Sequence, residues 1–141
     1  MSKYKTDLPP PTVPPCMLFC DGVIVEQGSG KTTLVGTYSG IAAPSFPSPP
    51  RDIHVYVRLT SYVGDVPVRL VCLRTDGIEP QEIYSTVHKV HFRDKLFVEQ
   101  VHIIWTQFQF PAPGEYAFQL WSKDRCIAER RLHARVKGEG R

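Results

Sequence analysis

Hydrophobic and polar residues alternate with a period of two along most of this chain. The clearest stretch is Ile53–Leu59, in which the odd positions are aliphatic and the even positions are polar or amphipathic. Comparable runs cover Val23–Glu26, Thr32–Tyr38, Val66–Leu73, Ile83–Phe92, Val98–Phe110, Tyr116–Trp121 and Cys126–Val136. Because successive side chains of a strand point to opposite faces, this period predicts half-buried β-strands.

The alternation also predicts which side chains share a face of a strand. In the run Val98–Phe110 we expect Val101, Ile103 and Trp105 on one face, and Ile104, Phe108 and Phe110 on the other. No window of ten or more residues has a clear helical period. Ala128–Val136 is the nearest rival, since it is rich in helix formers, but it follows a polar turn in a chain that is otherwise β.

The segment Gln27–Thr33 superficially resembles a phosphate-binding loop. That motif requires a first glycine where this chain has Val25, and it requires a helix after the loop. Thr32–Tyr38 is instead rich in β-branched residues. We therefore predict a hairpin in which the glycines occupy the turn between two strands.

The fold class that follows is all-β. Roughly eight short strands separated by turn residues favour an antiparallel β-sandwich, and a small closed β-barrel is the competing architecture. The order of the strands cannot be read from this pattern.

Proline clusters divide the chain. Residues 1–15 are expected to form a proline-rich extended leader, which is either a tether or a recognition motif for a partner. Residues 16–136 form the predicted β domain, and residues 137–141 form a flexible tail. A chain of 141 residues is long enough for one such domain with its own core.

Composition excludes several classes of protein. A net charge of +3 is too small to indicate a nucleic-acid partner, and no apolar run is long enough to span a membrane. The amino terminus has no signal-peptide core, which predicts a cytoplasmic location. The four cysteines do not have zinc or redox spacing, so we expect buried reduced thiols.

The segment Phe110–Leu120 resembles the tyrosine corner of immunoglobulin-like sandwiches. The resemblance implies that the hydroxyl of Tyr116 bonds to the backbone near Ala112. Phe118 stands where an immunoglobulin domain would have its second cysteine. Together with Leu18–Val23 and Leu34–Tyr38, the Pro113–Tyr116 turn is also similar to a family of small bacterial proteins of unknown function. The similarity implies a compact β-sandwich over residues 17–136, with no catalytic residues to carry over.

The sequence contains no catalytic constellation that we can name. His88 and His91 would point to opposite faces of a strand, so they do not form a metal pair, and we expect no metal and no cofactor. The basic residues near the carboxyl end are expected to protect an edge strand from pairing. The candidate interface residues are Trp105, Trp121, Arg130 and Arg131.

These observations favour a non-enzymatic module that binds a protein partner or assembles with itself. The alternative is a β-sandwich that binds a carbohydrate or another small molecule, and an enzyme is a third option.

Overall fold

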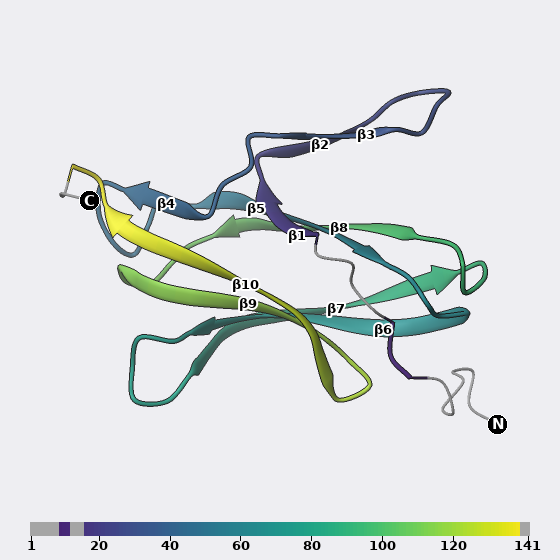
Figure 1. The fold of residues 1–141 in the computed structure, drawn as a ribbon. Helices are drawn as coiled ribbons and strands as arrows, with labels where there is room; N and C mark the ends of the chain where they lie inside the picture. Colours follow the sequence, from purple (N-terminus) through teal and green to yellow (C-terminus); the bar gives the residue numbers. More distant parts are fainter. Residues whose placement is uncertain (1–8, 12–15, 139–141) are drawn as a thin grey trace.

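The computed structural model describes residues 9–11 and 16–138, and this part of the chain contains ten β-strands and no helix. The expected leader and tail lie outside the described residues except at positions 9–11 and 137–138. The strands labelled in Figure 1 are β1 (Met17–Cys20), β2 (Gly22–Val25), β3 (Thr32–Val35), β4 (Gly40–Ala43), β5 (Arg51–Leu59), β6 (Gly64–Arg74), β7 (Gln81–Phe92), β8 (Glu99–Phe108), β9 (Gly114–Ser122) and β10 (Arg125–Val136). The all-β prediction is confirmed.

The strands form two facing layers and a separate hairpin (Figure 1). One layer is a three-stranded sheet in the order β1-β5-β8, and the other is a five-stranded sheet in the order β4-β10-β9-β6-β7. Strands β2 and β3 pair only with each other among the described strands, and Figure 1 shows their hairpin on the outer side of the three-stranded layer. The Thr32 hydroxyl on β3 donates to Gln100 Oε1 on β8.

Two of the ten strands were not expected from the sequence. Both β1 and β4 are four residues long, which is too short for alternation to be visible. Strand β4 also departs from the expected antiparallel arrangement, because it pairs in parallel with the end of β10. A parallel pair requires a long connection, and residues 44–124 lie between β4 and β10 in the sequence.

The hydrophobic core lies between the two layers, and aromatic rings from both sheets meet in it. Phe118 of β9 is fully buried, and its ring centroid lies 4.8 Å from that of Phe19 on β1. The ring centroid of Trp105 on β8 lies 5.5 Å from that of Phe118. An aromatic side chain buries a large apolar area and favours such tilted ring contacts. Phe118 of the five-stranded sheet therefore packs against rings of two strands of the three-stranded sheet and joins the layers.

A β-bulge in β8 overturns one of the expectations from alternation. Arg51 pairs with Phe108 while Ile53 pairs with Trp105, so β8 contains one extra residue between these pairs. Gln107 has a φ of 57°, and its backbone N–H donates to Asp52 Oδ1 at 3.2 Å. The extra residue turns Phe108 toward the core, where it is 8% exposed, on the same side as Trp105. The prediction that Phe108 shares a face with Ile104 is wrong.

The hairpin prediction for the glycine-rich segment is confirmed. Val25 pairs with Thr32, and Gly28 and Gly30 in the turn have φ values of 92° and 70°. Glycine accepts such positive φ angles without the steric cost that a side chain would cause. No helix follows Lys31, so the loop lacks the helix N-terminus that a phosphate site requires.

Candidate binding groove

Strands β7 and β8 are each the last strand of their sheet, and they lie side by side in different layers. Among the described strands, β7 pairs only with β6 and β8 pairs only with β5. The ring of Tyr84 on β7 is 4.8 Å from that of Trp105 on β8, which places both edges on one side of the molecule. An unpaired strand edge presents backbone N–H and C=O groups to any chain that approaches it.

A groove of about 470 Å³ runs between these two edges. Its β7 wall is formed by the end of that strand and its β8 wall by the beginning of that strand. The lining residues are His88, Lys89, Val90, His91 and Arg93 on one side and Glu99, Gln100, Val101, His102 and Ile103 on the other. Both walls therefore combine an exposed strand edge with polar side chains.

A polar seam lies next to the groove and joins its two walls. The indole N–H of Trp105 on β8 donates to Thr86 Oγ1 on β7 at 2.7 Å. Thr86 Oγ1 is also 2.7 Å from His88 Nε2. Burial lowers the pKa of His88, because charging a desolvated imidazole is unfavourable. The seam therefore ties the edge of one layer to the edge of the other.

Lys89 and His91 of β7 lie on the outer face of that strand. His91 Nδ1 is 2.6 Å from Asp65 Oδ1 on β6, and Lys89 Nζ is 3.7 Å from Asp65 Oδ2. His88 instead bonds to Thr86 on the inner side of the strand. The prediction that His88 and His91 point to opposite faces is confirmed by these separate partners.

A pair of histidines lies on the outer face of the three-stranded sheet. His54 Nδ1 on β5 and His102 Nε2 on β8 are 2.8 Å apart, and their rings are inclined by 21° with centroids 5.0 Å apart. One ring must donate its N–H to an unprotonated nitrogen of the other, so the contact requires at least one neutral imidazole. Burial, together with the nearby His54, lowers the pKa of His102.

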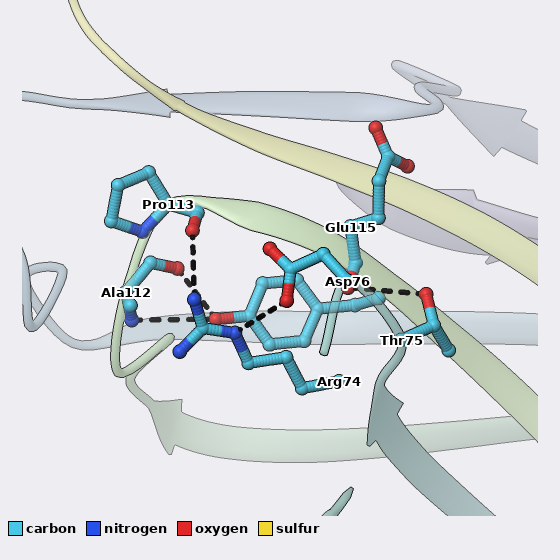
Figure 2. Close-up of polar contacts among 7 residues, drawn as sticks. Arg74, Thr75, Asp76, Ala112, Pro113 and Glu115 are labelled. Carbon is cyan, nitrogen blue, oxygen red and sulfur yellow. Dashed lines mark hydrogen bonds and ion pairs between the residues drawn. The ribbon is translucent and has the colours of Figure 1, made fainter. Parts of the chain in front are cut away.

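An extensive polar cluster lies at the opposite end of β6 and is structural (Figure 2). Tyr116 Oη donates to the Ala112 carbonyl at 2.5 Å, which is the hydrogen bond expected from the tyrosine-corner resemblance. Arg74 Nε donates to Asp76 Oδ1 at 2.8 Å, and the Asp76 carboxylate lies where a side chain on Gly114 would extend. Arg74 Nη2 donates to the Pro113 carbonyl at 3.4 Å, and the Thr75 N–H donates to the Glu115 carbonyl at 3.0 Å. These two bonds fasten the turn after β6 to the start of β9.

The four candidate interface residues lie in different environments. Trp105 is 4% exposed and takes part in the seam, so it offers no surface to a partner. Trp121 is partly exposed beside a hollow of about 240 Å³. Arg130 and Arg131 are both exposed on β10. The structure does not bring these four residues together.

The expectation that β10 is a protected edge holds for part of that strand. Residues 133–136 pair with β4 on one side, whereas residues 125–132 have only β9 as a described partner. Arg130 pairs in register with the buried Phe118, which places the arginine on the inner face of the unpaired stretch. An inward charge of this kind discourages another strand from pairing at that edge.

The cysteines and other possible ligands do not form a reactive site in the described residues. Cys20 and Cys72 are buried, and burial raises the pKa of Cys72 to about 12. Cys126 is exposed and Cys16 partly so, which corrects the expectation that all four thiols are buried. Within residues 9–11 and 16–138, no three His, Cys, Asp or Glu side chains are arranged to hold a metal ion.

The groove between β7 and β8 was not found from the sequence. Its residues are ordinary members of two alternating runs, and nothing local marks either run as an edge. The order of strands in a sheet depends on pairings between distant segments, which a single sequence does not display.

Some solved structures contain a part that resembles this chain. Part of a Listeria innocua β-glucosidase in complex with isofagomine has a similar structure at 9% identity and a TM-score of 0.49, covering 70% of this chain and 15% of the glucosidase. The complex of the Listeria innocua β-glucosidase with glucose gives 9% identity and a TM-score of 0.48, covering 68% and 14% of the two chains. This chain thus spans about 15% of the length of that protein. No curated protein matches the sequence.

The described residues contain no helix with the length and apolar character needed to cross a membrane. A protein-family model matches residues 15–135, which is nearly the whole of the described β domain. The chain belongs to the family of unknown function DUF6941.

Proposed function

We propose that the chain is a non-enzymatic module, an immunoglobulin-like β-sandwich in architecture, that binds protein by adding a partner strand to β7. The observation that supports this most is the length of the unpaired edge. Strand β7 has twelve residues, about twice the usual length of a strand. Long exposed edges are normally shortened, covered or charged, because they pair readily with other chains.

The side chains of β7 support the same proposal. Val87 is 66% exposed at the middle of the strand, and Tyr84 is 47% exposed nearby. In strand addition, backbone hydrogen bonds supply affinity and alternate side chains supply specificity. Val87 on the outer face and Tyr84 on the inner face are placed to contact the side chains of an added strand.

A comparison with β10 sharpens the argument. The unpaired part of β10 carries the inward Arg130 and the exposed Arg131, whereas the middle of β7, from Tyr84 to His88, carries no permanently charged residue. These two unpaired stretches therefore differ in the inward charge that prevents strand addition.

Photocrosslinking tests the proposal. A chain carrying benzoyl-phenylalanine in place of Val87 is expressed in cells, irradiated and isolated, and its adducts are identified by mass spectrometry. Ile24 on the β2–β3 hairpin, which is 56% exposed, provides the control position. We expect a defined protein adduct from position 87 that is missing from position 24. Identical adducts from both positions, or none from position 87, would contradict the proposal.

A second candidate function is carbohydrate or small-molecule binding beside Trp121. The hollow there is lined by Pro67, Arg69, Val87 and Lys123 in addition to Trp121. A partly exposed indole with charged neighbours is a suitable platform for a sugar ring. Glycan-array binding that is lost in Trp121→Ala and kept in Trp105→Phe would support this candidate over the first.

A further inference from the structure

We propose that the strand added to β7 is the β7 of a second copy of this chain, paired antiparallel about a two-fold axis at Val87. This inference rests on the function proposed above and names its partner. It is carried by the distribution of charge along β7, which is acidic near the start of the strand and basic near its end. Glu82 lies in the first part, and Lys89 and His91 lie in the last part.

The register of β7 against β6 determines which residues would face each other. Cys72 pairs with Tyr84 and Leu73 with Glu82, so Ile83 is bulged and does not occupy a paired position. Counted in paired positions from Val87, Glu82 lies four positions in one direction and His91 four positions in the other. A two-fold axis at Val87 therefore places Glu82 of each copy opposite His91 of the other.

The remaining pairs are also compatible. On the outer face, Val87 meets its own counterpart and Ser85 meets Lys89 of the second copy. Directly opposite residues on one face of an antiparallel pair have Cβ atoms about 4.5–5.5 Å apart, so these pairs are in contact. No two like charges face each other in this register. A parallel arrangement would instead place Lys89 against Lys89 and Glu82 against Glu82.

A self-complementary interface requires this division of charge within one strand. A two-fold axis places the first half of β7 in one copy opposite the last half of β7 in the other copy. A foreign partner places no such condition on β7. The exposed Val87 at the centre then becomes buried at the axis. The existing contacts of Glu82 with Arg69 (3.3 Å) and of His91 with Asp65 (2.6 Å) hold both side chains on the outer face, where they would meet.

Disulfide crosslinking tests the register directly. The full-length chain carries Cys16→Ser and Cys126→Ser as background, since these two native thiols are exposed or partly exposed. Opposed residues of an antiparallel pair have Cα atoms about 4.5–5.5 Å apart, which a disulfide can bridge. We expect Val87→Cys to form a covalent dimer under mild oxidation.

A mixed pair of variants separates the proposed register from nonspecific contact. Ser85→Cys alone and Lys89→Cys alone should remain uncrosslinked, because each would lie about 13 Å from its own counterpart. A mixture of the two should crosslink. Light scattering of the unmodified chain should give twice the chain mass of 16.0 kDa in the same conditions.

The outcomes distinguish the two proposals. Crosslinking of Ser85→Cys or Lys89→Cys with itself, or a strict monomer at high concentration, overturns self-pairing. If photocrosslinking at position 87 then still gives one foreign protein, strand addition to β7 stands with another partner. If position 87 gives no adduct of either kind, both proposals fail.

Discussion

The indole N–H of Trp105 and the hydroxyl of Thr86 are 2.7 Å apart and connect two strands that belong to different sheets. Trp105 is 4% exposed, so its N–H has little access to water if Thr86 is lost. The contact also sets how close β7 approaches β8 along the groove. The stability of the protein and the shape of the proposed binding edge therefore both depend on the hydroxyl of Thr86.

Replacement of Thr86 by Val should destabilise the protein by about 1–3 kcal/mol, because it leaves a buried donor without an acceptor. Thr86→Ser keeps the hydroxyl and should lose less. The free energy of unfolding from urea titration measures both variants. A loss in Thr86→Ser as large as that in Thr86→Val would contradict the assignment of the effect to the hydrogen bond alone.

Gly114 is required by both its backbone and its neighbour. Its φ is 147°, and a Cβ at this position would overlap the carboxylate of Asp76. We expect Gly114→Ala to destabilise the protein by about 1–3 kcal/mol, the usual cost of strained backbone at one residue. Gly22→Ala is the matched control, since a Cβ at Gly22 would meet no atom within 4 Å and the φ of Gly22 is not positive. Thermal unfolding compares the two variants, and a similar change in both would contradict this account.

The hydroxyl of Tyr116 is expected to contribute to stability through its bond to the Ala112 carbonyl. Tyr116→Phe keeps the ring but removes both the bond that the hydroxyl donates to the Ala112 carbonyl and the bond that it accepts from the Ala112 N–H at 3.3 Å. It should therefore cost about 1–2 kcal/mol. Tyr62→Phe is the control, because the buried hydroxyl of Tyr62 has no hydrogen-bond partner within the described part of the structure. Chemical denaturation of the two variants should therefore give a clear difference. A loss in Tyr62→Phe as large as that in Tyr116→Phe would contradict the assignment.

The sequence predicts the parts of this fold that depend on local pattern. Alternation identifies Ile53–Leu59 as a strand, and the Gly-x-Tyr motif leads to the partner of Tyr116. Alternation fails at Phe108, because a β-bulge reverses the direction of that side chain. The bulge is stabilised by Asp52, which lies on another strand. Alternation also fails for the binding edge, because the unpaired position of β7 follows from the order of all the strands. What is missing is information about pairing, and no local pattern contains it.

Stability should decrease as the pH falls below the ordinary histidine range. Burial lowers the pKa of both His88 and His102 in the folded chain. The unfolded chain then binds more protons than the folded chain, so the stabilising contribution is complete above about pH 6.5 and is lost as the pH falls through the lowered values. For His102 the main cause of the lowered pKa is burial, and the neighbouring His54 adds to it.

Urea titrations between pH 7.5 and 5.5 measure this dependence. The range lies above the titration of ordinary carboxyl groups, so the two histidines should dominate the slope. The double variant His88→Gln and His102→Gln should be less stable at pH 7.5 but should change less between the two pH values. If the slope is unchanged in the double variant, other groups control the pH response, and the described packing of these imidazoles does not determine it.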